Sequence, residues 1–516
     1  MSASTSETTL PMDGEGARSR DLERLAHALE DDEEQNRKSA APHASLAHSE
    51  KSKEHDPYAV ALEPAEDPKN LPEWRKWLVV VIISTGTLCA TSASSMAAFA
   101  EEGVSSTFHV GSEVTILGVS FFVLGLGIGP LLIGPLSEVY GRNWIYRISY
   151  GLFFAFSWAV AFAPHIAVYL IFRFLTGFSS SAFLSVAGGS ISDLFDNHKI
   201  ATPMAIYTGS PFIGPVLGPL IAGFINQNTS WRWTFRILII WTFMVWTMLL
   251  FLVPETYVPY LLKTKAAKMR KQTGDERYWA PLDRRPHSLA RSLALSCYVP
   301  FELLIVDQMA LLLDIWSALL LGILYLTFQA FPIVFGEVHH FEQEFVGMTF
   351  LGIGVGMTVG LLCQPLFNRH LRNVAAKNGG QAPPEARLVP GMIGGVMVPA
   401  SLYWLAFTTY GNVHWIAPII ASVPFGMGIL FIFISVFTYT VTAYRPIAAS
   451  AMAANAFVRT TSAAAFPLFA GQMYHRLGTV GATALLAGLT TVAAPLPFVF
   501  YHIGARLRAK SKFGAA

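Results

Sequence analysis

Long runs of apolar residues recur along the chain from Trp77 to Ile503, and short polar segments separate them. A helix needs ~20 mostly apolar residues to cross the hydrocarbon core of a bilayer. The pattern therefore predicts an all-α membrane protein with twelve spans. We expect these spans near residues 78–98, 114–136, 144–163, 166–190, 202–224, 234–254, 309–335, 345–366, 389–408, 413–437, 446–470 and 480–503.

The polar segments divide the chain into five parts. Residues 1–76 are predicted to be a disordered cytosolic tail, because they hold too few apolar side chains to offset the entropy of ordering. Residues 77–254 and 306–503 form the predicted N-terminal and C-terminal six-helix bundles. Residues 255–305 are expected to link the bundles in the cytosol, and residues 504–516 to form a second cytosolic tail.

The distribution of Lys and Arg predicts the orientation of the spans, because cytosolic connections of membrane proteins carry an excess of these residues. Placing both chain ends and the even-numbered connections in the cytosol puts nearly every Lys and Arg on that side. The exceptions are Arg232, Arg236 and Arg476 outside, and Arg173 and Arg459 within spans. We therefore expect a multi-pass membrane protein with both ends of the chain in the cytosol.

Composition excludes a water-soluble globular protein. Hydrophobic residues make up 53% of the chain and charged residues only 14%, against ~25% in soluble domains. The net charge of +2 indicates neither a nucleic acid nor another strongly charged partner. The chain has no HExxH, GxSxG or Gly-Lys sequence, so we expect neither an enzyme nor an ATP-driven pump. The three cysteines lack metal-site spacing, and no metal site is expected.

A glycine pattern repeats in the two predicted bundles. Three alternate glycines occupy the second span, and three more occupy the same place in the eighth span. They are Gly125, Gly127 and Gly129 in the first set and Gly352, Gly354 and Gly356 in the second. Two similar six-span halves are typical of transporters that are built from internal repeats. The sequence thus favours a 6+6 arrangement with pseudo-twofold symmetry.

The loop after the second span, residues 134–142, reads GPLSEVYGR and resembles the signature loop of the major facilitator superfamily. We take Gly134, Glu138, Gly141 and Arg142 as a cytosolic gate loop. Glu138 and Arg142 can pair with each other or with a neighbouring helix end, and a plain helix–turn–helix is the alternative. The next residue, Asn143, departs from the family pattern, in which a second basic residue is common.

Residues 209–219, within span five, read GSPFIGPVLGP and resemble the antiporter motif of the same superfamily. Its site residues are Gly209, Gly214, Pro215 and Gly218. Small residues of this kind let helices approach closely, and Pro introduces a kink. The resemblance implies an exporter rather than an importer.

Further stretches, spread over residues 65–512, are similar to the fungal drug:proton antiporter family with twelve spans. They include WRWTF at 231–235, PETY at 254–257, YLTFQAFP at 325–332, PGM at 390–392, FPLF at 466–469 and RLRAKSK at 506–512. The resemblance implies a major facilitator fold and proton-driven efflux of drugs, toxins, polyamines or metabolites. It implies no cofactor, since the proton gradient supplies the energy, and it implies the plasma membrane of a fungus.

Acidic and basic residues inside spans are the candidates for proton coupling, because burying them in a membrane is costly without a function. Asp314 in span seven is the first candidate, with an ion pair or a water-filled vestibule as the alternative. Arg173 in span four is associated with proton transfer in the family, but a brace between helices is equally open. Asp193 is a third candidate, although a simple helix-end charge is favoured there. Asp307 is expected to lie solvated at the interface.

Aromatic and polar side chains of spans seven and eleven form the predicted substrate cavity. They are Tyr325, Phe328, Gln329, Phe331, Asn455 and Arg459. Many relatives carry an acid where this chain has Gln329, which disfavours a polyamine cargo and favours a neutral, amphipathic or anionic one. Arg459 is expected either to bind a carboxylate of the cargo, to balance Asp314, or to serve in a helix–helix hydrogen bond.

The sequence leads to a proton-coupled antiporter that exports a small molecule. Both broad multidrug efflux and dedicated secretion of a metabolite, such as a glycolipid or an organic acid, remain open. A proton symporter that imports a nutrient is the alternative, and the span-five pattern argues against it. The expected partners are the small-molecule substrate and the lipid bilayer, with the protein acting as a monomer and without nucleic acid.

Overall fold

The computed structural model describes residues 58–196, 199–283, 289–379 and 382–511. These residues belong to one compact unit, Pro57–Ala516. The predicted N-terminal tail lies outside the described residues up to position 57, and so do residues 512–516 of the predicted C-terminal tail.

The described part of the N-terminal half is built from helices. After the short helix η2 (Pro68–Asn70), the elements in chain order are α3 (Glu73–Phe99), α4 (Glu101–Phe108), α5 (Ser112–Tyr140), α6 (Arg142–Ala161), α7 (Ile166–Ser180), α8 (Ala182–Ser185), α9 (Ala187–Leu194), α10 (Ala201–Asn228) and α11 (Arg232–Leu252). Along the packed faces α3 runs beside α10, α5 beside α7, and α6 beside both α7 and α11.

The rest of the chain continues with α12 (Val258–Thr273), α13 (Leu289–Val306), α14 (Gln308–Phe331), η3 (Pro332–Val338), α15 (Gln343–Thr349), α16 (Leu351–Leu362), α17 (Gln364–Lys377), η4 (Pro384–Leu388), α18 (Val389–Thr408), α19 (Ile416–Ala443), η5 (Arg445–Ile447), α20 (Ala448–Ala493) and α21 (Leu496–Lys510). In this half α14 packs along α20, and α19 packs along α16 and α18. The halves meet where α3 contacts α14, α5 contacts α20, and α10 contacts α15 and α16.

Ten helical stretches of the described chain are long and apolar enough to cross a membrane. One of them, Ala448–Ala509, is divided by Gly478, whose φ of 73° and ψ of 167° are not helical. The 20-residue helix α6 lies outside this set of ten, but it packs along α7 and α11, and we count it as a further crossing. Counting α6 and dividing the last stretch gives the twelve crossings that the hydrophobic pattern predicts.

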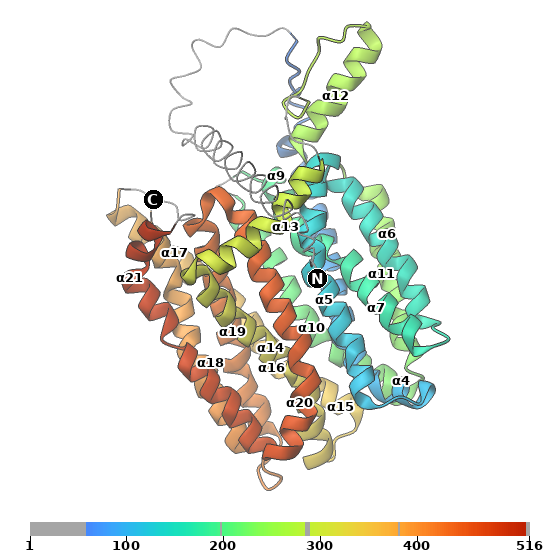
Figure 1. Cartoon of the computed structure of the whole chain (residues 1–516), viewed down its shortest axis with the longest axis vertical. Helices are drawn as coiled ribbons and strands as arrows, with labels where there is room; N and C mark the ends of the chain where they lie inside the picture. The colour runs from blue at the N-terminus through green and yellow to red at the C-terminus, as the bar shows by residue number, and fades with distance from the viewer. Residues whose placement is uncertain (1–57, 197–198, 284–288, 380–381, 512–516) are drawn as a thin grey trace, which may run out of the picture. The chain divides into compact units, whose positions relative to one another are not determined.

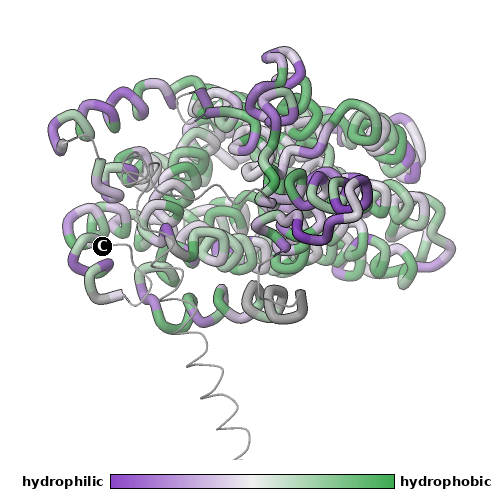
Figure 2. The backbone as a smooth tube through the Cα atoms, turned by 90° about the horizontal axis from the view of Figure 1, so that it is seen from above, coloured by the Kyte–Doolittle hydropathy of each residue, from purple (hydrophilic) through white to green (hydrophobic). Residues whose placement is uncertain are grey.

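The crossings alternate between two faces of the molecule. We call the face where α3 begins and α21 ends the terminal face, and the other the opposite face. In Figure 1, α9 and α12 lie at the upper, terminal face, whereas α4 and α15 lie at the lower, opposite face. Figure 2 shows hydrophobic positions on the outside of the helices as well as between them, as a lipid-facing surface requires.

The segment predicted as a polar linker contains a helix that the hydrophobic pattern did not separate from its surroundings. α13 packs against α5 of one half and α20 of the other, so it bridges the halves rather than hanging free. Leu303 is buried in the core, and the ring of Phe301 lies edge-on to Phe457 with centroids 5.0 Å apart. Apolar side chains of α13 thus gain burial against both bundles.

Candidate transport site

The gate loop turns the chain between α5 and α6 at the terminal face. Gly141 adopts a φ of +88°, which side-chain-bearing residues rarely adopt, and a Cβ there would overlap the Glu255 carboxylate. That carboxylate accepts the backbone N–H groups of Arg142 at 3.0 Å and Asn143 at 3.1 Å, the first of α6. A negative charge is favourable at a helix N-terminus. Glu255 therefore ties α6 to the end of α11, a role that the sequence did not indicate.

The side chain of Arg142 decides between the two pairings left open by the sequence. Its Nε lies 3.2 Å from Oδ2 of Asp193 at the end of α9, and an Nη donates to Ser137 Oγ at 3.1 Å. The guanidinium also lies over the ring of Tyr257. Glu138 is exposed instead. The gate loop is thus held to a neighbouring helix end, and Asp193 lies in this contact at the terminal face.

The antiporter-like stretch of α10 packs directly on α3. A Cβ on Gly214 would overlap Thr91 Oγ1, and one on Gly218 would overlap Ser95 Oγ. Ser92 Oγ donates to the Gly214 carbonyl at 3.0 Å across the same contact. These two glycines therefore allow the close approach of the helices. Three prolines stand inside α10 at 211, 215 and 219, so Pro215 belongs to a helix with several missing backbone donors.

Gly209, one turn earlier on α10, faces the other half instead. A Cβ there would lie 2.6 Å from Cδ1 of Leu361 on α16. Gly134 of the gate loop has open space around its Cα. The predicted motif glycines therefore differ in what they contact.

Arg173 is buried within the N-terminal half, with 1% of its surface exposed. Its Nε donates to the Gly118 carbonyl at 2.8 Å, and both Nη groups donate to the Ala93 carbonyl at 3.2 Å. The guanidinium lies 4.4 Å from the ring centroid of Phe122. These contacts tie α7 to α5 and α3. Of the two roles that the sequence left open, proton transfer and a brace between helices, they are the contacts of a brace.

A polar cluster lies inside the C-terminal half, between α14 and α20. Asp314 is 2% exposed, and its Oδ1 accepts the Asn455 amide at 2.8 Å. The same amide donates to Ser317 Oγ at 2.8 Å. Asp314 Oδ2 has no hydrogen-bond partner within the described chain. One turn beyond Asn455, Arg459 lies against the rings of Phe437 and Phe433.

Asp307 does not lie where the sequence placed it. The expectation of a solvated side chain at the interface is wrong, because Asp307 is buried at 6% exposure. Its carboxylate caps α14 by accepting the N–H groups of Met309 and Ala310 at 3.0 Å. It also accepts the hydroxyls of Tyr444, at 2.7 Å, and of Ser511. Asp307 thus gathers three chain segments at the terminal face, which is a structural role.

The predicted cavity residues of span seven lie largely at the seam between the halves. The Tyr325 hydroxyl shares a hydrogen bond of 2.8 Å with Ser94 of α3. Gln329 donates from Nε2 to both carboxylate oxygens of Glu101 at 2.9 Å. Phe328 packs against the ring of Tyr325 with centroids 5.1 Å apart. Glu101 was not among the sequence candidates, because it follows the first span and gives no local sign of its partner.

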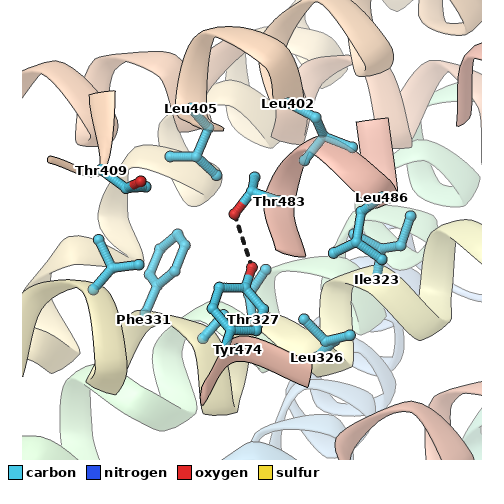
Figure 3. Close-up of a pocket in the computed structure, with 12 residues that line it drawn as sticks. Ile323, Leu326, Thr327, Phe331, Leu402, Leu405, Thr409, Tyr474, Thr483 and Leu486 are labelled. Carbon is cyan, nitrogen blue, oxygen red and sulfur yellow. Dashed lines mark hydrogen bonds between the residues drawn. The ribbon is translucent and has the colours of Figure 1, made fainter. Parts of the chain in front are cut away.

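Figure 3 shows a pocket inside the C-terminal half, between α14, α18 and α20. Its lining is mainly aliphatic, and Phe331 is the predicted cavity residue that contributes to it. The hydroxyls of Tyr474 and Thr483 are hydrogen-bonded at 3.0 Å on one side of the pocket. Asp314, Asn455 and Arg459 lie outside this lining, so the predicted cavity residues do not line one common pocket. Among the described residues, no group of three or more His, Cys, Asp or Glu side chains is placed so that it could hold a metal ion.

Comparison with known proteins identifies the family. The sequence profile of the Major Facilitator Superfamily matches residues 82–467. The chain belongs to this superfamily. The xylose transporter XylE from E. coli, in a partially occluded inward-open conformation, has the same fold, with a TM-score of 0.60 at 16% identity over 83% of this chain and 98% of that one.

Relatives of much higher similarity are fungal efflux proteins. Efflux pump atB of Aspergillus terreus is 43% identical over 87% of this chain and 88% of its own length. The probable drug/proton antiporter YHK8 of Saccharomyces cerevisiae is 42% identical over the same shares. The multidrug transporter mdrA of Aspergillus fumigatus is 39% identical over 90% of this chain and 77% of its own length. The superfamily member described here is an efflux transporter of this fungal group.

Proposed function

We propose that this transporter exports small amphipathic molecules in exchange for protons, and that Asp314 holds the coupling proton. The observation that carries the proposal is the Asp314–Asn455 pair, buried between the two helices that pack most extensively in the C-terminal half. One carboxylate oxygen is bonded to Asn455, and the other has no partner in the described structure. The name of the Saccharomyces relative, a drug/proton antiporter, supports proton coupling.

The chemistry of exchange follows from the burial of this acid. A charged carboxylate in a membrane interior is costly unless a donor or a cation stabilises it. Arg459, on the same helix as Asn455, supplies the nearby positive charge and a cargo donor supplies a hydrogen bond to Oδ2. Protonation of Asp314 removes the acceptor for that donor and so releases the cargo. Proton binding and cargo binding are then mutually exclusive, as antiport requires.

The surroundings of this cluster favour a neutral or weakly anionic amphipathic cargo. Arg459 offsets the charge of Asp314, and the rings of Phe433 and Phe437 beside it supply apolar surface. The rings of Phe212 and Phe433 stack across the halves with centroids 5.0 Å apart. Drugs and fungal secondary metabolites share this amphipathic character. Import of a nutrient is disfavoured by the antiporter-like packing of α10 on α3.

We place the terminal face in the cytosol and the protein in the plasma membrane as a monomer. The excess of Lys and Arg at that face supports this orientation. Reporter tags at Met1 and Ala516 should both face the cytosol. Tags on opposite sides of the membrane would contradict the arrangement.

Exchange in liposomes tests the coupling directly. The purified protein is reconstituted, and only molecules with the terminal face outward are analysed by blocking the others with an impermeant reagent. Nile red, a neutral amphipathic dye, is expected to accumulate inside the liposomes when the lumen is made acidic. Protons should leave the lumen through the protein in exchange for the dye that enters. Dye movement in the same direction as the protons would establish symport, and dye movement indifferent to the gradient would remove proton coupling.

A further inference from the structure

Glu101 and Gln329 join the two halves of the transporter at the opposite face. Glu101 begins α4, directly after the first span closes at Phe99, and Gln329 lies near the end of α14. The amide nitrogen of Gln329 donates to both oxygens of the carboxylate at 2.9 Å. Two residues that lie in different halves therefore share one bidentate contact.

This contact is part of a seam of hydrogen bonds on the same face. One turn before Gln329 on α14, Tyr325 is bonded to Ser94 of α3. Gln343 at the start of α15 donates from Nε2 to the Phe99 carbonyl at 2.7 Å. These bonds join α3 and α4 to α14 and α15. Opening the opposite face must break them, and it increases the exposure of the half-buried Glu101 to water.

The partner of Glu101 is a neutral amide rather than a cation. Around it, Tyr169 of α7 is the titratable group near enough to interact electrostatically, and Gln343 of α15 is another neutral amide. The charged groups of the neighbouring elements are engaged elsewhere or exposed. Glu113 of α5 accepts from Gln472, Arg232 of α11 donates to the carbonyls of Ala161 and Ala163, and Glu102 of α4 itself is exposed.

We propose that Glu101 is a proton-binding site of the gate at the opposite face, which takes up a proton from outside as that face closes and returns it when the face opens. In the closed seam both carboxyl oxygens lie 2.9 Å from Gln329 Nε2. A neutral carboxyl accepts from Nε2 through its carbonyl oxygen, and its O–H is satisfied once the Gln329 amide turns Oε1 toward it. This site rests on the orientation proposed above. It is separate from Asp314, which lies seven residues after Asp307 near the other end of α14.

The sign of the pH effect follows from the burial of the acid. Glu101 is half-buried in the closed face, and desolvation there raises its pKa from the ordinary value of 4.5 to about 8, against the lowering effect of the Gln329 hydrogen bond. In the open face the carboxyl is solvated and returns toward 4.5. A group whose pKa is higher in one state stabilises that state below the raised value. Closure is therefore favoured as the external pH falls from about 8 toward 4.5, and the preference is lost above about 8.

Distance measurements on the full chain test this site without any cargo. Spin labels are attached at Ser106→Cys on α4 and Glu337→Cys on η3, in a background with Cys89, Cys297 and Cys363 replaced. We expect a short distance at pH 5 and a shift to longer distances as the pH rises above about 8. Glu101→Gln imitates the neutral acid and should hold the short distance at every pH. Glu102→Gln, the exposed neighbour, is the matched control and should behave as the parent.

A second variant keeps the test decisive if Glu101→Gln fails to fold. Gln329→Met removes the donor but leaves the acid, and it should move the distance change to a higher pH, because the lost hydrogen bond lowered the pKa of Glu101 in the closed face. A pH-dependent change of the spin-label distance that persists unchanged in Glu101→Gln, or in Gln329→Met, would overturn the proposal. Asp314→Asn should keep the pH shift of the distances while losing exchange. Failure of the coupling proposal and failure of the gate proposal therefore give different results.

Discussion

Asn455 of α20 holds Asp314 of α14 through a hydrogen bond of 2.8 Å, and it donates to Ser317 at the same length. Its own Oδ1 has no hydrogen-bond partner in the described chain. The amide orients one oxygen of the acid, and the other is buried without a hydrogen-bond partner in the described chain. This pairing links residues 141 positions apart and sets the acid between the two helices.

Asp314→Asn should abolish proton-driven exchange and leave membrane insertion intact. An amide has nearly the shape of the acid, but it cannot lose or gain the coupling proton. Exchange driven by a pH gradient is expected to fall at least about tenfold, a barrier change of ~1.4 kcal/mol. Asp275→Asn, in the linker after α12, is the control and should exchange normally. Normal pH-dependent efflux by Asp314→Asn would remove this acid from the mechanism.

Arg142→Ala should slow transport without changing the preference among cargoes. The substitution removes the contacts to Asp193 and Ser137 that hold the gate loop to α9 in the N-terminal half, whereas the Asp314 cluster lies in the C-terminal half. Asp193→Asn should have a similar effect, and the double variant should be less than additive because both changes break one pair. Initial rates for a panel of dyes check this. A changed order of preference would show that Arg142 contacts the cargo.

Gly214→Ala should impair transport because α10 cannot approach α3 as closely. The new methyl group would overlap Thr91 Oγ1, and overpacking of this kind costs ~1–3 kcal/mol. Thr91→Ala removes that oxygen and should restore part of the activity in the double variant. Gly188→Ala is the matched control, since a Cβ there meets nothing within 4 Å. Equal behaviour of the Gly214 and Gly188 variants, measured by efflux and thermal unfolding in detergent, would refute the packing argument.

Arg173→Met should lower stability rather than alter the pH profile of exchange. The guanidinium donates to backbone carbonyls of α3 and α5, and losing hydrogen bonds from a charged group costs ~1.5–3 kcal/mol. Thermal unfolding in detergent should shift downward, and the protein that remains folded should keep the parental pH dependence. A normal unfolding temperature with a displaced pH profile would instead assign Arg173 to proton transfer.

The crossings themselves were predictable, because a bilayer accepts a chain only where it is apolar and forms helix. The predicted second span, 114–136, lies within α5 at Ser112–Tyr140, and the predicted sixth, 234–254, matches α11 at Arg232–Leu252 to within two residues. The sequence missed α13, which is not one of the crossings, because charged residues near its start gave the whole segment a polar character and hid a helix that packs on both halves.

Side-chain partners were far less predictable. The sequence indicated that Arg142 would pair at the gate loop, yet Asp193, 51 residues away, is its partner rather than the nearby Glu138. Asp307 was expected in solvent, but Tyr444 and Ser511 converge on it from distant segments. A carboxylate is satisfied by whichever donors the fold brings within reach, and local composition does not report them.

The sequence alone determined the membrane class, the twelve crossings, the motif loops and Asp314 as a candidate acid, because hydropathy and motif spacing are local properties that the bilayer enforces. Only the tertiary structure decided that Glu101 meets Gln329, 228 residues away, and that the predicted cavity residues do not line one common pocket. Those arrangements depend on which helices lie side by side and at what depth. That choice is made by packing over the whole molecule.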